Sequence, residues 1–123
     1  MNDSRIERLT PDGWRRFQRI RLAALAESPD AFGSTLGEAQ DRTEPEWRKQ
    51  LETIDTFVAV YDETDIGLVR GAPDDRDLST AFLLSMWVAP AYRGQGCGKR
   101  LIQTVVEWAR AAGFARLVLD VSD

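Results

Sequence analysis

The sequence of 123 residues contains no histidine and only one cysteine, Cys97. Without histidine, the usual general base near neutral pH is missing, and acid–base chemistry falls to Asp, Glu, Tyr, Lys, Cys, a chain terminus or water. A single cysteine excludes a disulfide within the chain and a structural zinc site built on cysteines. We therefore expect neither a disulfide framework nor a metal centre.

Long apolar runs and net positive charge are also missing. No apolar stretch approaches the ~18 residues that indicate a membrane span. The first residues, MNDSRIERLT, lack the apolar region of a secretory signal. The net charge of −4 does not fit a nucleic-acid binder. We expect a cytoplasmic protein with neither nucleic acid nor membrane as a partner, and an acidic surface would favour cationic substrates such as amines.

The composition present suits one packed domain spanning residues 1–123. Hydrophobic residues make up 43% of the chain and charged residues 29%, which allows a core and argues against disorder. Patterns in the first half predict a strand at Arg5–Leu9, a helix from Thr10–Pro11 to about Ala26, a loop at Glu27–Thr35 and a helix at about Glu44–Thr53.

The second half predicts most of a sheet. Its elements, in chain order, are strands at Thr56–Tyr61 and Ile66–Gly71 around a turn at Asp62–Asp65, a long strand at Ser79–Val88, a helix from about Gly96 to Ala112 and a strand at Ala115–Val121. The first two strands form an antiparallel hairpin. The last strand is apolar on both faces, which is typical of a central, parallel strand. Gly113 suits the C-terminal cap of the helix. The order predicts an α/β fold.

The stretch WVAPAYRGQGCGKRL, from Trp87 to Leu101, carries the clearest functional signal. A loop that enters a helix presents unpaired backbone N–H groups at the positive end of the helix dipole. Three alternating glycines let these amides turn toward a ligand. Arg93 adds a charged planar donor and Lys99 a further positive charge. The pattern predicts an anion site, most simply for a phosphate group.

Two familiar phosphate loops do not match this stretch. A Walker loop requires a glycine where Arg93 stands and Ser or Thr where Arg100 stands. The dinucleotide fingerprint requires a glycine at Lys99 or, in the other possible frame, at Leu101. Both nucleotide-binding interpretations are therefore set aside.

The pattern Val88-x-Pro90-x-x-Arg93-Gly94-x-Gly96-x-Gly98 resembles the acetyl-CoA signature of the GNAT superfamily of N-acetyltransferases. That signature has the form [Arg/Gln]-x-x-Gly-x-[Gly/Ala], and Arg93, Gly96 and Gly98 fill its fixed positions. The predicted order of elements is also similar to that of the family. The resemblance implies a GNAT-type mixed sheet, acetyl-CoA as acetyl donor, and a small-molecule or peptide amine as acceptor.

The resemblance assigns roles residue by residue. Main-chain groups of Met86 and Val88 would hold the pantetheine arm. The amides across the loop, with help from Lys99, would hold the pyrophosphate; the loop residues are Arg93, Gly94, Gln95, Gly96, Cys97 and Gly98. A neutral amine would attack the thioester carbonyl, and the N–H of Val88 would stabilise the oxyanion. The base and the acid stay unassigned.

The family's final helix and hairpin would follow Asp123, so the resemblance implies a domain that is incomplete at its C-terminus. The tyrosine that commonly protonates the departing thiolate belongs to that part, and we expect Tyr61 and Tyr92 to be packing residues. The last strand would be left at a sheet edge. We expect a chain that is marginal alone or pairs with another chain, for which a homodimer is the default.

Several alternatives stay open. The chain could be a non-catalytic acyl-CoA-binding or regulatory module, or an inactive truncated domain that serves only for interaction. Cys97 is better interpreted as a packing residue than as a nucleophile. Glu38, Asp120 and Asp123 could approach an amine but also suit solvated positions, and Trp87 could face either the core or the acceptor.

Overall fold

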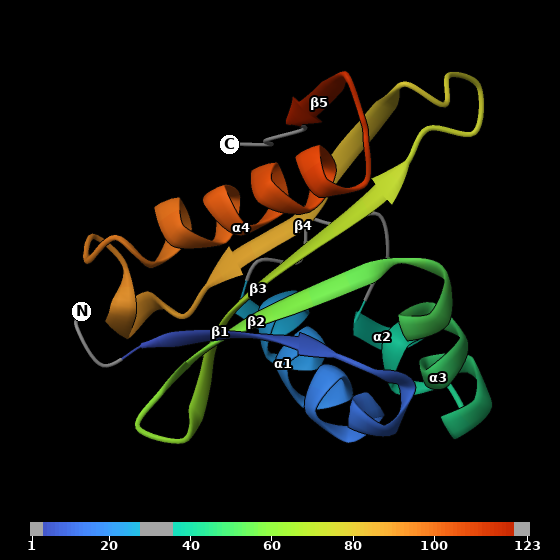
Figure 1. Cartoon of the computed structure of the whole chain (residues 1–123). Helices are drawn as coiled ribbons and strands as arrows, with labels where there is room; N and C mark the ends of the chain where they lie inside the picture. The colour runs from blue at the N-terminus through green and yellow to red at the C-terminus, as the bar shows by residue number, and fades with distance from the viewer. Residues whose placement is uncertain (1–3, 28–35, 120–123) are drawn as a thin grey trace.

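The computed structural model describes residues 4–27 and 36–119, which form a five-stranded sheet with helices on both faces (Figure 1). The strands lie in chain order, β1-β2-β3-β4-β5. The pairs β1–β2, β2–β3 and β3–β4 are antiparallel, and β5 is parallel to β4. Their bounds are β1 Arg5–Leu9, β2 Asp55–Tyr61, β3 Thr64–Pro73, β4 Thr80–Val88 and β5 Arg116–Leu119. This is the GNAT-type α/β fold that the sequence predicts.

The helices of the first half follow the predictions with two differences. The chain turns through a short 3₁₀ helix at Pro11–Gly13 before α1, which covers Trp14–Glu27. Thr10 is extended and precedes that turn, but its side chain makes no capping hydrogen bond. A short helix α2, Leu36–Gln40, was not predicted. The helix α3 is confirmed at Glu44–Thr53.

The hairpin between β2 and β3 is tighter than predicted. The strands extend inward until only Asp62 and Glu63 connect them, and both residues have a positive φ (49° and 61°). Two residues with positive φ are the geometry of a two-residue hairpin turn, whose twist matches that of the strands. The predicted four-residue turn is therefore wrong at its C-terminal end, because Thr64 and Asp65 belong to β3.

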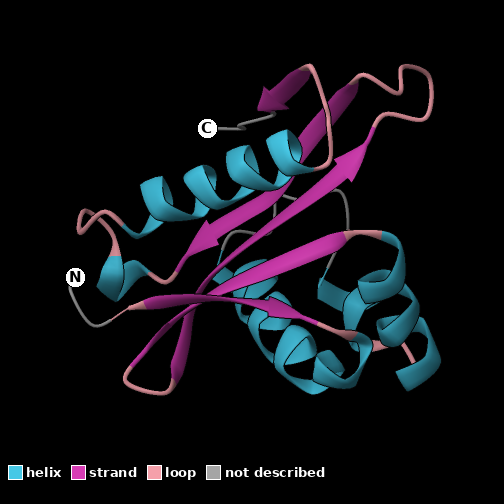
Figure 2. Cartoon of the chain, viewed as in Figure 1, coloured by secondary structure: helices cyan, strands magenta, loops and turns pink. Residues whose placement is uncertain are grey.

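Helices lie on both faces of the sheet (Figure 2), and each face carries its own hydrophobic core. α1, α2 and α3 cover one face, where Phe17 and Trp47 meet edge to face at 5.4 Å between ring centroids. α4, Cys97–Ala111, covers the other face. It ends close to the predicted position, and Gly113 follows its last turn with a φ of 87°. In the part of the chain that the structure describes, no helix is long and apolar enough to cross a membrane.

Arg70 is a charged residue in the core beneath α1. It is 4% exposed and donates to Thr56 Oγ1 at 3.0 Å and to the Gln50 carbonyl at 2.9 Å. Its guanidinium also lies 4.8 Å from the centroid of the Phe17 ring. Burial lowers the pKa of Arg70 to about 9, which leaves it charged at neutral pH. The face beneath α1 is therefore electrostatically unlike the apolar face beneath α4.

β5 lies at the edge of the described sheet. Its parallel pairing with β4, predicted from its apolar pattern, is confirmed. Its side chains are more exposed than those of a central strand: Val118 is 42% exposed and Leu119 is 45% exposed. The edge position follows from the strand order rather than from the residues of β5.

Candidate functional site

The C-terminal half of β4 leaves the regular ladder. Leu68 of β3 faces Trp87 and Arg70 faces Leu84, so two residues of β4, Ser85 and Met86, oppose Val69 alone. Ser85 has a φ of 56°. This is a β-bulge, a feature that often lies next to active sites because it redirects the chain. No local pattern in the sequence indicates this bulge.

Beyond the bulge, one edge of β4 is open among the described residues. Pairing with β5 covers Thr80 to Leu83 and stops there. The N–H of Ala89 donates to the Ile66 carbonyl of β3 at 2.8 Å. Because successive residues of a strand direct their main-chain groups to opposite edges, Val88 directs its N–H and C=O to the open edge. This is the edge at which the main chain of Val88 can meet a ligand.

The loop after β4 has the geometry of an anion site. A short 3₁₀ helix at Pro90–Tyr92 leads into the glycines, and Gly94 and Gly96 have φ values of 78° and 87°. Gly96 is the N-cap of α4, so the unpaired N–H groups of that helix begin beside it. A Cβ at Gly94 or Gly96 would meet no atom within 4 Å. The space over the loop is open and lies at the positive end of a 15-residue helix.

The loop and the end of β4 adjoin through Gly98. A Cβ built there would lie 3.8 Å from Val88 Cγ2 and 4.0 Å from Met86 Cε. The first turn of α4 therefore packs against β4 just past the bulge. The structure thus brings together all nine residues that the sequence singled out: Met86, Val88, Arg93, Gly94, Gln95, Gly96, Cys97, Gly98 and Lys99.

The side chains of these residues divide into exposed and buried groups. Arg93 and Gln95 are exposed on the loop, and Lys99 is exposed in the first turn of α4. Cys97 is 4% exposed and packs in the core beneath α4, and burial raises the pKa of its thiol. The prediction that Cys97 is a packing residue is confirmed, and its contribution to a ligand is limited to its backbone.

Arg93 does not extend freely over the loop. Its Nε donates to the Val88 carbonyl at 2.9 Å, and its guanidinium forms an ion pair with Glu27 at the end of α1. Glu27 Oε1 also accepts from the indole N–H of Trp87 at 3.3 Å. One carboxylate thus links α1, the end of β4 and the glycine loop.

Glu27 is the functional candidate that the sequence analysis missed. The sequence predicts a helix that ends at about Ala26 and places Glu27 in the loop that follows. Its partner Arg93 stands 66 residues away, beyond the reach of any local pattern. The sequence does contain one signal. A carboxylate near the C-terminal end of a helix is unfavourable because it opposes the helix dipole, so a cationic partner elsewhere in the chain is expected.

Other predicted candidates lie elsewhere. Tyr61 and Tyr92 contact each other with ring centroids 5.8 Å apart, which confirms them as packing residues. The side chain of Trp87 belongs to the core beneath α1. Glu38 is exposed in the first turn of α2. Asp120, Asp123 and residues 28–35 of the predicted loop lie outside the described residues.

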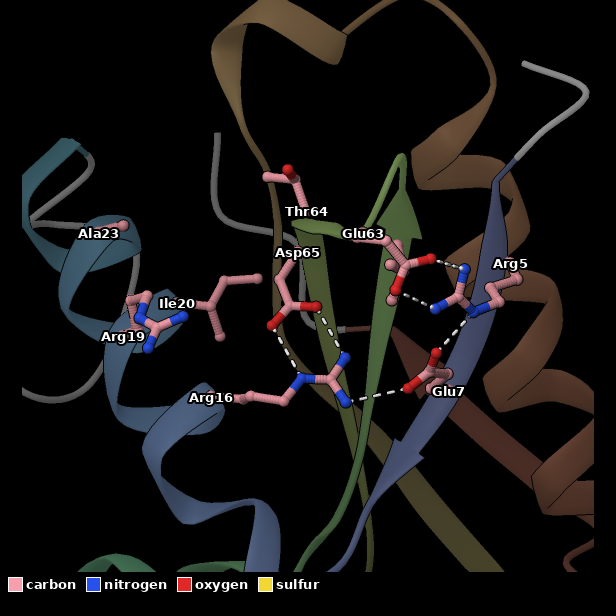
Figure 3. A pocket seen from close by; sticks show the side chains of 10 residues that line it. Arg5, Glu7, Arg16, Arg19, Ile20, Ala23, Glu63, Thr64 and Asp65 are labelled. Atoms are coloured by element: carbon pink, nitrogen blue, oxygen red, sulfur yellow. Dashed lines mark hydrogen bonds and ion pairs between the residues drawn. The ribbon is translucent and has the colours of Figure 1, made fainter.

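A cavity of about 540 Å³ lies between α1, β1 and the start of β3, and no residue of the glycine loop lines it (Figure 3). An ion-pair network lines it. Arg16 of α1 binds Asp65 through two hydrogen bonds of 3.1 and 2.7 Å and also reaches Glu7 at 2.9 Å. These contacts join α1 to β1 and β3.

Comparisons with known proteins agree with this geometry. A model of the acetyltransferase (GNAT) family matches residues 18–123. The human protein N-acetyltransferase 8B is 37% identical over an alignment of 70 residues that covers 54% of this chain. The matched chain spans only 31% of the length of that relative.

Solved structures share the fold at low sequence identity. An aminoglycoside acetyltransferase from an uncultured soil metagenomic sample, in complex with sisomicin, superimposes with a TM-score of 0.77 at 21% identity, over 99% of this chain and 80% of that one. Ribosomal-protein-alanine N-acetyltransferase from Brucella melitensis biovar Abortus 2308 gives 0.68 at 19% identity, over 97% and 80%. Aminoglycoside N-acetyltransferase AAC(6')-Iy, in complex with CoA, gives 0.70 at 18% identity, over 97% and 77%.

Proposed function

Because the chain belongs to the acetyltransferase (GNAT) family, we propose that it transfers the acetyl group of acetyl-CoA to a primary amine. The proposal rests on one observation: the open, bulged end of β4 lies next to a glycine loop at a helix N-terminus. The first offers main-chain groups to an extended arm, and the second offers amides to a phosphate.

The residues present fit acetyl-CoA. The amides from Arg93 to Gly98 would hold the pyrophosphate, with the charge of Lys99 nearby. The open edge of β4 at Met86 and Val88 would hold the pantetheine arm as a neighbouring strand does. The empty space over Gly94 and Gly96 supports this fit, since side chains there would occupy the cradle.

The chemistry supplied by the bound donor is an activated acetyl thioester. The nitrogen of a neutral amine would form a bond to the carbonyl carbon, the C–S bond would break with CoA leaving as its thiolate, and the proton lost by nitrogen would pass to solvent or to a base. The N–H of Val88, directed to the open edge, would stabilise the charge that develops on the carbonyl oxygen. An ammonium group must first lose a proton, because its pKa lies near 10.

The first experiment is a calorimetric titration of the chain with acetyl-CoA, with acetate as the control. We expect saturable binding of acetyl-CoA only. Gly96→Val should weaken that binding by about 100-fold or more, because the side chain would fill the cradle and a branched residue resists a positive φ. Gly37→Val, at an open position in α2 away from the loop, is the matched control. Unchanged affinity in Gly96→Val would contradict the cradle assignment.

The second experiment separates transfer from binding alone. Thiol release is measured with a panel of amines. The panel includes sisomicin, which is bound in one structure of similar fold, and a peptide that begins with alanine, because another structure of similar fold is a ribosomal-protein-alanine N-acetyltransferase. Release that depends on an amine supports the transferase. Saturable acetyl-CoA binding without release for any amine would favour the non-catalytic acyl-CoA-binding module.

A further inference from the structure

The cavity between α1, β1 and the start of β3 has an apolar base. Ile20 of α1 is 4% exposed and Val60 of β2 is 2% exposed, and both belong to the core beneath α1. Three arginines, three carboxylates and the hydroxyl of Thr64 surround this base. The volume of about 540 Å³ is typical of pockets that hold small molecules. No residue of the proposed acetyl-CoA site lines the cavity.

Two of the arginines join the three carboxylates in one network (Figure 3). Arg16 binds both oxygens of Asp65 and one oxygen of Glu7. Arg5 binds the other oxygen of Glu7 at 2.6 Å and both oxygens of Glu63 at 3.1 and 3.3 Å. The hydrogen bonds from Arg16 and Arg5 lower the pKa of Glu7, which keeps this carboxylate ionised at neutral pH. Two guanidinium groups thus face three carboxylates, and the network carries one net negative charge.

Arg19 is the third arginine of the cavity, and it lies outside this network. Among residues 4–27 and 36–119, no side chain forms a hydrogen bond or an ion pair with its guanidinium. The neighbouring turns of α1 supply no acid, since the residues three and four positions away are Arg15, Arg16, Leu22 and Ala23. A guanidinium keeps its proton at neutral pH. Arg19 therefore brings one uncompensated positive charge to the cavity.

The cavity thus has two poles of opposite charge with apolar surface between them. Figure 3 shows Arg19 on α1 at one side, the network at the other side and Ile20 between them. The hydroxyl of Thr64 contacts the Asp62 carbonyl at a long 3.5 Å, so it can turn toward a ligand. A ligand with one charge of each sign complements both poles, whereas a simple anion or cation leaves one pole unmatched.

We propose that this cavity binds a small zwitterion in which a short apolar chain separates a carboxylate from an ammonium group, as in an ω-amino acid. The carboxylate accepts from Arg19, because a planar guanidinium matches the geometry of a carboxylate. The ammonium group donates to the carboxylates of the network, whose oxygens can each accept more than one hydrogen bond. The methylene groups between them lie over Ile20 and Val60. This site is additional to the proposed transferase site and does not depend on it.

The first test is an NMR titration of the unaltered chain without acetyl-CoA, in which the backbone amide signals are followed. We expect 5-aminopentanoate to shift the signals of residues that line the cavity in a saturable way, with a Kd on the order of 1 mM. Pentanoate lacks the ammonium group and pentylamine lacks the carboxylate. Each should bind about tenfold more weakly, because each loses one charged hydrogen-bonded contact.

Three outcomes of this titration would overturn the proposal. One is the absence of saturable shifts at the cavity with 5-aminopentanoate. The second is equal affinity for pentanoate or pentylamine, which would show that one charge is sufficient. The third is equal affinity for glycine, whose two charged groups stand on one carbon, because the proposal requires that they be apart.

The second test removes the positive pole. Arg19→Gln should weaken binding of 5-aminopentanoate about tenfold and leave binding of pentylamine unchanged. Arg15→Gln is the matched control, because Arg15 is an exposed arginine one turn earlier on α1 that does not line the cavity. It should change neither affinity. Equal losses in the two variants would overturn the assignment of Arg19, since they would reflect only the net charge of the chain.

The third test removes the excess charge of the negative pole. Glu63 is 81% exposed, so Glu63→Gln should fold, and thermal unfolding checks this. In this variant the affinity for 5-aminopentanoate should fall to that for pentanoate, because the network no longer carries a net negative charge. An unchanged preference for the zwitterion would overturn the role of the network. None of these titrations contains acetyl-CoA, so their result is distinguishable from a failure of the proposed function.

Discussion

The two halves of β4 are built for different purposes. From Thr80 to Leu83 the strand has a partner on each side, and its first residue is anchored by Asp77, whose carboxylate accepts from Ser79, Thr80 and Arg116. From Leu84 to Val88 the strand bulges, and one edge is open in the described part of the chain. The first half holds the sheet together, and the second half keeps main-chain groups available because it gives up pairing.

The largest difference between the halves should appear in stability. Leu83 is 2% exposed in the core beneath α4, and Met86 lies on the same face but is only partly buried. Leu83→Ala should cost about 2–5 kcal/mol of unfolding free energy, because it leaves a cavity, and Met86→Ala clearly less. Urea unfolding measures both. Equal losses would show that the two halves contribute alike.

Hydrogen exchange should separate the halves next. We expect saturating acetyl-CoA to slow amide exchange between residues 84 and 88 by about tenfold more than between residues 80 and 83, because only the second half gains a new partner. The control is the exchange of α3 amides, which reports global stabilisation by a bound ligand. Equal slowing of exchange along all of β4 would contradict the difference between the halves. Ligand binding to the folded state slows exchange in this uniform way through global stabilisation alone.

A smaller effect is expected from acid. Hydrogen bonds from Ser79, Thr80 and Arg116 hold the pKa of Asp77 well below its usual value of 3.8. A carboxyl with a lowered folded pKa stabilises the protein above its unfolded pKa, and this stabilisation is lost as the pH falls below about 4. The stability difference between the unaltered chain and Asp77→Asn should therefore shrink on acidification. It is measured by thermal unfolding at pH values from about 5 down to 2.

Asp75→Asn, in the same turn, is the control for the acid experiment and should show no such convergence. A constant difference between Asp77→Asn and the unaltered chain down to the lowest pH would mean that the Asp77 carboxylate keeps no special contacts in the folded chain.

The smallest effect is expected from Trp87→Phe. This change removes the indole N–H that binds Glu27 but retains most of the ring in the core beneath α1. A single hydrogen bond contributes about 0.5–1.5 kcal/mol, and this one is long at 3.3 Å. We expect the loss of unfolding free energy, measured by chemical unfolding, to lie within or below the range for a single hydrogen bond. A loss as large as that of Leu83→Ala would show that the second half of β4 is no less structural than the first.

The contrast between the halves also shows what the sequence could predict. The first half of β4, its loop and α4 follow from local patterns: apolar alternation, three glycines and helical spacing. The bulge at Ser85 does not, because it depends on how many residues of β3 oppose β4. Glu27 was missed for a similar reason. Its role depends on Arg93 and Trp87, which reach it only after the sheet and α1 have packed.

Two glycines of β3 have a consequence for the size of the donor that the proposed site would accept. Gly67 and Gly71 lie four residues apart beneath α4, where added Cβ atoms would come within 3.0 Å of Leu101 Cδ1 and 2.8 Å of Trp108 Cζ3. Side chains of α4 fill both notches, so the helix cannot slide along β3 without a clash. The distance from the glycine loop to the bulge is thereby constant. This constant distance would select the length of the donor. An acyl carrier in which the thioester lies too near the phosphate, or too far from it, could not place its phosphate at the loop and its thioester at the bulge together.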